Sequence, residues 1–186
     1  MQKQDLKTKY FKEVVPKMRE TFGYCNDLAV PRIVKIVTNT GIGRLSQQAN
    51  FEENLLPKII KEFSLIVGQK PKITRARNSI AGFKIRKGQI VGLTATLRSQ
   101  RMYDFLEKII KITLPRVRDF KGLDPKMVDQ NGNLTISFKD HLVFPEINPE
   151  DSMVDFGLEA TIVISGNRNR DEAIELYKLL GIPFKK

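Results

Sequence analysis

The sequence predicts an α+β fold, a largely antiparallel sheet with helices packed on one face and an additional N-terminal helix. Three observations lead to this prediction. Apolar residues make up 41% of the 186 residues, which is enough to bury a core. Runs of β-branched or alternating apolar residues, typical of strands, are mixed with apolar stripes at helical spacing. These segments do not follow the regular strand–helix alternation of a parallel sheet, which favours antiparallel pairing.

The first predicted element is the N-terminal helix, over residues 4–22. Apolar side chains recur there at helical spacing, and Gly23 is a suitable end for the helix. Pro16 lacks a backbone N–H group, so we expect it to kink or divide this helix. The β-branched segment 33–39 then predicts a strand.

A second helix is predicted over residues 50–67, where apolar residues form a single stripe. We expect the Asn50 side chain to cap its start and Gly68 to end it. Two strands are predicted next, at 72–77 and 90–98. The segment between these strands contains two glycines and no helical stripe, so it is predicted to be a loop.

The C-terminal half predicts two helices and two strands. A helix is expected at 102–114, with Pro115 stopping it, and a last helix is expected between Asn169 as its cap and Gly181. The strands are predicted at 134–138 and 158–165. Because the sequence contains no internal repeat and no long linker, we expect a single domain over residues 1–186.

Positive charge is concentrated in one part of the chain. The formal net charge is +11, and residues 69–101 hold nine lysines and arginines but none of the 21 acidic residues. Like charges in one segment repel each other and do not stabilise a fold, so a polyanionic partner is expected. A membrane surface is the main alternative, but it requires an amphipathic helix, whereas this segment is predicted to form strand, loop and strand. Nucleic acid is therefore favoured, with no membrane partner.

The remaining features of the chain limit its location. No apolar run approaches the roughly 20 residues that a membrane span needs. The N-terminus is charged from Lys3 onward and has no apolar signal core. We expect a cytoplasmic protein, or a mature protein of an organelle.

The sequence predicts no catalytic residue, no metal site and no cofactor. Its lone cysteine, Cys25, is expected to be a small buried side chain, and nothing local supports a role for its lone histidine, His141. Three acidic pairs occur at expected helix starts or in loops, where they complement the helix dipole or face solvent: Glu52-Glu53, Glu150-Asp151 and Asp171-Glu172. We expect no enzyme; the alternative is an RNA-processing or modifying enzyme that holds its substrate on the basic segment.

A pair of glycines, Gly41 and Gly43, follows the first predicted strand. The pair resembles part of a dinucleotide-binding fingerprint, but Ser46 occupies the position of the third glycine. The better interpretation is a tight turn where the backbone must come close to another group. That group could equally be an RNA phosphate or a neighbouring strand.

Several blocks of sequence resemble one known family. The stretch GQKPKITRARNSIAGFKIRKG, from Gly68 to Gly88, closely resembles the hallmark of the bacterial-type L-five family of large-subunit ribosomal proteins, which bind 5S rRNA in the central protuberance. Similar blocks occur in the order of that family along nearly the whole chain: VPRIVKIVTNTGIG (30–43), TLRSQRMYDFLEKII (96–110), LPRVRDFKGL (114–123), HLVFPEI (141–147) and LLGIPF (179–184). The chain departs from the family at Thr40, where methionine is usual, and at Ser99-Gln100, where Gly-Glu is usual.

The resemblance implies a two-layer α+β fold and a structural role in the large ribosomal subunit. Its implied partners are 5S rRNA, large-subunit rRNA, the tRNA in the peptidyl site and a small-subunit head protein, which it meets in an intersubunit bridge. These partners would place the protein in a cytoplasmic or organellar ribosome.

The resemblance also implies two groups of site residues. The resemblance implies 5S rRNA contacts at Asn39, Gly41, Gln69 and Thr96. The neighbouring basic residues Lys70 and Arg98 complete the predicted 5S rRNA-binding set. A basic projecting loop at about 78–88 is expected to face the tRNA, and its predicted set is Arg77, Ser79, Lys84, Arg86 and Lys87. If Phe83 and Ile85 pack inward, the loop lies flat and reaches less far.

Overall fold

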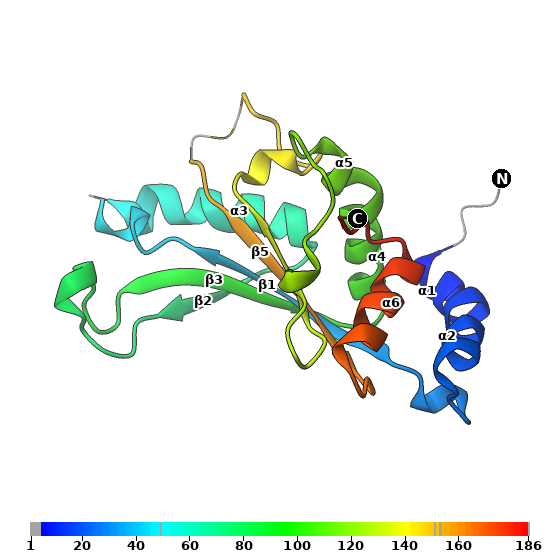
Figure 1. The fold of residues 1–186 in the computed structure, drawn as a ribbon. Helices are drawn as coiled ribbons and strands as arrows, with labels where there is room; N and C mark the ends of the chain where they lie inside the picture. The colour runs from blue at the N-terminus through cyan, green and yellow to red at the C-terminus, as the bar shows by residue number, and fades with distance from the viewer. Residues whose placement is uncertain (1–4, 49, 151, 153, 186) are drawn as a thin grey trace. The chain divides into compact units, whose positions relative to one another are not determined.

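The structure is a computed structural model that describes residues 5–48, 50–150, 152 and 154–185, so Gln4, the first residue of the predicted N-terminal helix, lies outside the described residues. Five strands form one antiparallel sheet in the order β2-β3-β1-β5-β4, and helices complete an α+β fold, as predicted (Figure 1). The strands are β1 (Arg32–Gly41), β2 (Lys72–Arg75), β3 (Ile90–Leu97), β4 (Leu134–Phe138) and β5 (Leu158–Ser165). The last two have the predicted bounds.

Three of the helices continue from a wider, π-type turn. The helices are α1 (Leu6–Lys9), α2 (Val15–Phe22), α3 (Leu56–Val67), α4 (Ser99–Lys108), α5 (Leu114–Arg116) and α6 (Arg170–Leu180). The π-type turns Tyr10–Val14, Phe51–Leu55 and Ile109–Thr113 directly precede α2, α3 and α5. Each of these helices carries a proline in its first turn, where the missing N–H group breaks the regular hydrogen-bond ladder. Pro16 thus divides the N-terminal helix as predicted, whereas Pro115 does not stop its helix, which continues to Arg116.

Asn50 and Asn169 occupy the predicted positions at the helix starts, but neither caps its helix through a side-chain hydrogen bond. Asn50 has a φ of 56° and its side chain accepts no capping hydrogen bond. Asn169 occupies the position before α6, but its side chain makes no capping bond either. The Glu172 carboxylate instead accepts a 2.6 Å hydrogen bond from the backbone N–H of Arg168. The glycines that end α2, α3 and α6 adopt the left-handed conformation, as their predicted role requires.

The chain forms two compact units. The first contains the described residues up to Ile36, Leu97–Ile136 and those from Thr161 onward, and the second contains Val37–Thr96 and Ser137–Ala160. No described helix combines the length and the apolar character needed to cross a bilayer.

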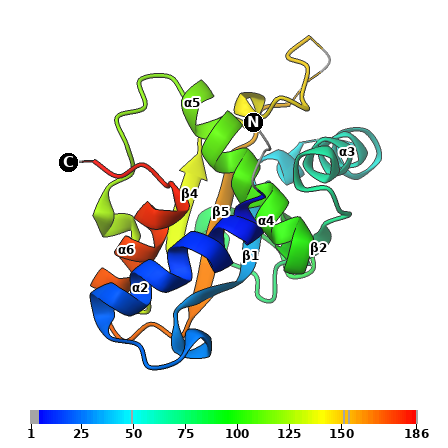
Figure 2. The ribbon, with the colours of Figure 1, turned by 90° about the vertical axis from the view of Figure 1, so that its right-hand side faces the viewer.

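In the first unit, helices enclose the core. Helix α2 packs against α6, and α1 packs against α4 (Figure 2). Met18, Leu106 and Tyr177 are fully buried there, and the Tyr177 hydroxyl donates to the carbonyl oxygen of Gly132 at 2.8 Å. Cys25 is exposed, which corrects the expectation of a buried cysteine.

In the second unit, α3 supplies Ile59, Phe63 and Ile66 to a core that also includes Leu93 of β3. Strands β2 and β3 pair antiparallel, with Lys72 opposite Thr94 and an irregularity between Thr74 and Arg75. This core supports one face of the strands, and the predicted RNA contacts occur along the same strands.

Candidate RNA-binding surface

The alternation of β1 decides which of its side chains can meet a ligand. Thr38 and Thr40 are buried, and the Thr40 hydroxyl donates a 2.6 Å hydrogen bond to the carbonyl oxygen of Gly157. Asn39 and Gly41, the predicted 5S contacts, are exposed. Because successive side chains of a strand point to opposite faces, burial of the threonines leaves Asn39 on the open side.

The other predicted 5S contacts of the second unit lie beside β3. Thr96 is exposed, and the Gln69 side chain donates a 3.1 Å hydrogen bond to the Thr96 carbonyl oxygen. Lys70 is exposed at the end of the α3–β2 connection. Neutral amide and hydroxyl groups of this kind can hydrogen-bond RNA backbone and 2′-hydroxyl groups.

Arg98, the remaining member of this set, belongs to the first unit and is exposed. It directly precedes Ser99, whose φ is 52°. Ser99 carries a Cβ atom, whereas glycine adopts a positive φ without steric cost.

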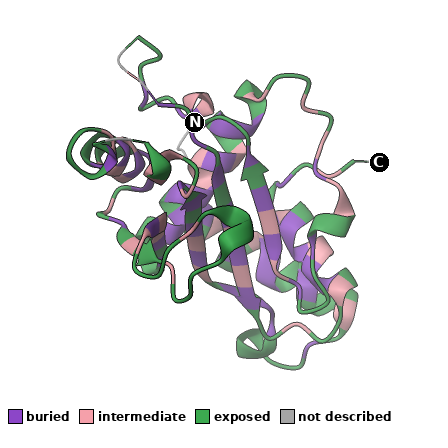
Figure 3. Cartoon of the chain, turned by 90° about the vertical axis from the view of Figure 1, so that its left-hand side faces the viewer, coloured by how far each residue is buried: buried purple, intermediate pink, exposed green. Residues whose placement is uncertain are grey.

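The basic loop is a hairpin extension of β2 and β3. Backbone hydrogen bonds join Ala76 to Gln89 and Gly88, and Ile80 pairs with Ile85 in both directions. The predicted loop residues are all exposed: Arg77, Ser79, Lys84, Arg86 and Lys87. The Phe83 side chain is 69% exposed, so it does not pack inward, while Ile85 is half-buried. Figure 3 shows how buried and exposed residues are distributed over the chain.

Two glutamines that were not among the predicted site residues hold this loop against the turn that follows β1. Gln47 donates from Nε2 to the carbonyl oxygen of Phe83 at 3.2 Å. Gln89 donates from Nε2 to the Ser46 hydroxyl at 2.8 Å and accepts the Arg86 N–H through Oε1 at 3.0 Å. No local sequence pattern marks the bonds to Phe83 and Ser46, because each joins residues of separate segments.

The glycines of this region have different structural causes. A Cβ atom at Gly92 would lie 2.7 Å from the carbonyl oxygen of Thr40, so the neighbouring strand requires glycine there. A Cβ atom at Gly41 would meet nothing within 4 Å among the described residues, and one at Gly43 would make only ordinary contacts with Val91. Neither Gly41 nor Gly43 has a positive φ. Contact with a neighbouring strand therefore does not explain why this pair is glycine.

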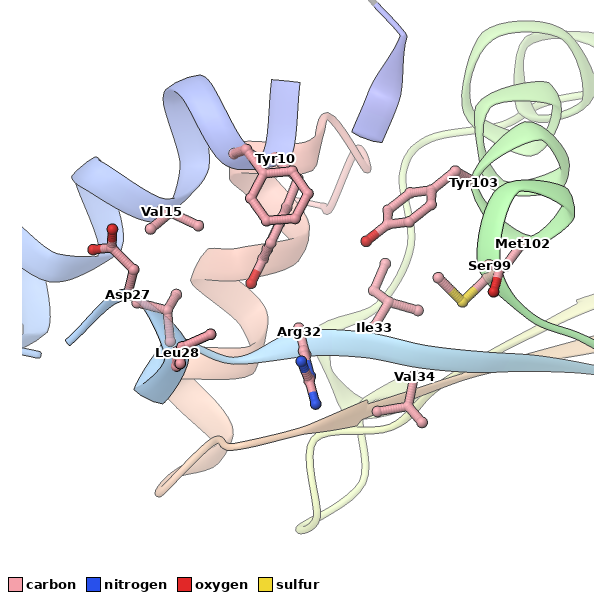
Figure 4. Close-up of a pocket in the computed structure, with 12 residues that line it drawn as sticks. Tyr10, Val15, Asp27, Leu28, Arg32, Ile33, Val34, Ser99, Met102 and Tyr103 are labelled. Carbon is pink, nitrogen blue, oxygen red and sulfur yellow. The ribbon is translucent and has the colours of Figure 1, made fainter. Parts of the chain in front are cut away.

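A separate cavity of about 400 Å³ lies in the first unit. Figure 4 shows Tyr10 and Tyr103 above the Arg32–Val34 stretch of β1 that forms its base. Its walls are mainly apolar, and the Tyr10 hydroxyl donates to the carbonyl oxygen of Pro31 at 3.0 Å. None of the predicted RNA contacts lines this cavity.

The geometry of the lone histidine does not support the alternative of an enzyme. His141 is fully buried and stacks on Phe156, with ring centroids 4.1 Å apart. Ser152 Oγ and Glu62 Oε2 both approach its Nε2 atom, at 2.9 and 3.2 Å. A hydroxyl–imidazole–carboxylate relay needs these groups on different ring nitrogens. Within the described residues, no group of three or more acidic, histidine or cysteine side chains is placed to hold a metal.

The acidic pairs of the sequence take other roles. Glu172 does not face solvent, because it is 3% exposed and accepts hydrogen bonds from Tyr24 and Arg168. Glu52, Glu53 and Asp171 are exposed at helical starts, as expected. Glu150 is exposed in a loop, and its neighbour Asp151 lies outside the described residues.

Comparison with known proteins identifies the family. The profile for "Ribosomal protein L5" matches residues 26–86, and the profile for the C-terminus of the same ribosomal protein family matches residues 90–184. A protein from Desulfatibacillum aliphaticivorans is 46% identical over 97% of this chain and 98% of its own length. The chain belongs to the ribosomal protein L5 family.

Other L5 relatives match over a similar extent. Proteins from Pseudothermotoga lettingae and Thermotoga maritima are 50% and 48% identical, and each match covers 97% of this chain and 96% of the relative. All three relatives bear the name large ribosomal subunit protein uL5. The two L5 profiles leave residues 87–89 unmatched between them, at the end of the basic loop, and they do not cover residues 1–25 and 185–186.

Proposed function

We propose that this L5-family protein is a structural constituent of the large ribosomal subunit that binds 5S rRNA and helps to attach it to the central protuberance. The 5S contacts are assigned to Asn39, Gly41, Gln69, Lys70, Thr96 and Arg98. The observation that carries the proposal is the exposed polar group on β1 and β3, where Asn39 and Thr96 face solvent and Gln69 reaches the Thr96 carbonyl oxygen. A basic loop with no acidic residue adjoins these strands.

The proposal includes the partners that the family resemblance implies. The loop at about 78–88 contacts peptidyl-site tRNA through Arg77, Ser79, Lys84, Arg86 and Lys87, all of which are exposed. Large-subunit rRNA and a small-subunit head protein, the latter in an intersubunit bridge, complete the set. The whole chain acts as a single RNA-binding domain within the ribosome, and the protein performs no chemical reaction.

A filter-binding titration with 5S rRNA tests the central assignment. Asn39→Ala, Gln69→Ala and Thr96→Ala should each weaken binding by about 1–3 kcal/mol, the cost of a lost hydrogen bond at a desolvated contact. Thr21→Ala on α2 is the matched control, because this exposed threonine bonds only within its own helix. Wild-type affinity in all three site variants would refute the assignment.

A further inference from the structure

One groove of the second unit lies between the two proposed RNA sites. Its inner wall is the turn after β1, with Gly41, Gly43 and Arg44, and its outer wall is the tip of the basic loop, with Phe83 and Lys84. Gln47 joins the walls through its bond to the Phe83 carbonyl oxygen, and the groove has a volume of about 660 Å³. The groove is therefore held open by the fold and does not depend on a ligand for its shape.

The lining of the groove has the chemistry of a nucleotide site. Arg44 and Lys84 are exposed, and within the described residues neither side chain makes a hydrogen bond or an ion pair. Among the residues that the structure describes, no acidic side chain lines the groove. The Phe83 ring is 69% exposed, although burial of an aromatic ring is normally favourable. Two cationic side chains without a partner among the described residues are suited to bind the phosphates of an RNA backbone, and the exposed ring is suited to stack on an unpaired base.

The glycines strengthen this interpretation. Gly41 and Gly82 line the groove, a Cβ atom at either position would meet nothing within 4 Å among the described residues, and neither has a positive φ. The fold itself therefore accepts a larger residue at both positions. Glycine there gives a ligand access to the backbone, as it does where phosphate approaches a chain closely.

We infer that this groove binds one unstacked RNA nucleotide, with its base on the Phe83 ring and its flanking phosphates on Arg44 and Lys84. The inference rests on the proposed RNA-binding function and adds a nucleotide site to it. Because the walls belong to the 5S-contacting turn and the tRNA-facing loop, the nucleotide comes from 5S rRNA or from the peptidyl-site tRNA. Loss of the ring should cost roughly 5- to 150-fold in affinity, the usual effect of removing one base-stacking side chain.

The test compares Phe83→Ala with Phe11→Ala, which removes a ring of similar exposure, 61%, from the first unit. One arm measures 5S rRNA affinity by filter binding, and the other measures tRNA dissociation from ribosomes reassembled with each variant. We expect Phe83→Ala to change one arm by about 5-fold or more, which identifies the source of the nucleotide, while Phe11→Ala changes neither. Arg44→Gln should affect the same arm as Phe83→Ala, with Lys17→Gln on α2 as its control.

A fluorescent variant checks that the ring stacks on a base. The chain contains no tryptophan, so Phe83→Trp introduces a single reporter. If 5S rRNA is the source, its addition should quench the emission of Phe83→Trp and leave that of Phe11→Trp unchanged.

No change in either 5S rRNA affinity or tRNA dissociation for Phe83→Ala and Arg44→Gln would overturn the groove site. Unchanged RNA arms with weaker joining of the two subunits would show instead that a protein covers Phe83. Failure of the wild-type protein to bind 5S rRNA would refute the proposed function, and the tRNA arm would still decide the groove.

Discussion

The Tyr24 hydroxyl donates a 2.7 Å hydrogen bond to the carboxylate of Glu172, which lies 148 positions further along the chain. The same carboxylate accepts the Arg168 N–H, and the Arg168 guanidinium lies 4.8 Å from the centre of the Tyr24 ring. Because Glu172 is buried, these hydrogen bonds link the segment after α2 to the start of α6 at a position shielded from water.

Removal of this carboxylate should destabilise the fold. Glu172→Ala leaves the buried Tyr24 hydroxyl and the part-buried Arg168 N–H without an acceptor, and we expect it to lower the free energy of unfolding by about 2–4 kcal/mol. Asp171→Ala, at the exposed neighbouring position, is the control and should change it by less than about 0.5 kcal/mol. Urea unfolding gives both values, and equal values for the two variants would contradict a structural role for Glu172.

Tyr10 should make stability depend on alkaline pH. Burial, with a smaller contribution from Tyr103, raises its pKa to about 12, whereas the unfolded chain should titrate near 10. The folded state then retains a proton that the unfolded state releases. The stabilisation is therefore complete below pH 10 and is lost as the pH rises toward 12, by up to about 1.4 kcal/mol per pH unit.

Tyr10→Phe isolates this effect. The variant loses the hydrogen bond to the Pro31 carbonyl oxygen, so at pH 8 it should be about 1 kcal/mol less stable than the wild type. Because phenylalanine does not titrate, this difference should shrink by pH 11. Urea unfolding at both pH values measures it, and a constant difference would argue against a raised pKa for Tyr10.

Two glycine variants should separate folding from binding. In Gly92→Ala the new Cβ atom would lie 2.7 Å from the Thr40 carbonyl oxygen, so we expect a loss of about 1–3 kcal/mol in stability. Gly41→Ala should leave stability unchanged or raise it by about 0.4–1 kcal/mol, because it restricts the unfolded chain. It should nevertheless weaken 5S rRNA binding. Loss of stability in Gly41→Ala without loss of RNA affinity would show that Gly41 is needed for folding and not for RNA binding.

The position of the basic loop should depend on Gln89. Gln89→Met keeps the length of the side chain but removes its bonds to Ser46 and Arg86. We expect faster hydrogen exchange at residues 80–87, with little change elsewhere in the second unit. Gln48→Met, at an exposed position of the neighbouring turn, is the control. Unchanged exchange in the loop would show that the backbone bonds alone hold it.

Charge removal should distinguish the two uses of the basic loop. With Lys84, Arg86 and Lys87 all replaced by alanine, 5S rRNA binding should lose at most the one groove phosphate contact of Lys84, because the other assigned 5S contacts lie outside the loop. Reassembled ribosomes should release peptidyl-site tRNA faster. If the loop instead binds 5S phosphates, each lost contact should reduce the slope of log K against log salt by roughly 0.7–0.9. A slope reduced by about two units or more, with unchanged tRNA release, would refute the tRNA assignment.

Local sequence patterns were sufficient to predict many of the helices and strands and the position of the charge. Strands β4 and β5 have the predicted bounds, because alternation between buried and exposed residues is a property of neighbouring positions. The glycines that end α2, α3 and α6 were also predictable from neighbouring positions, because the left-handed residue that ends a helix is usually glycine. The acid-free segment 69–101 was visible in the sequence, and the structure shows its loop residues to be exposed.

Packing between distant segments determines which residues contact each other and which remain accessible. Glu172 is buried because Tyr24 and Arg168 supply donors from other segments, and the sequence alone assigned it to solvent or the helix dipole. The sequence does not distinguish the roles of Gly41 and Gly92. The arrangement of the strands leaves space for a Cβ atom at Gly41 among the described residues, whereas it places the backbone of Thr40 against Gly92. The glutamine contacts that hold the loop are likewise absent from any local pattern. Local patterns record the preferences of neighbouring residues, whereas these contacts arise only when distant segments pack together.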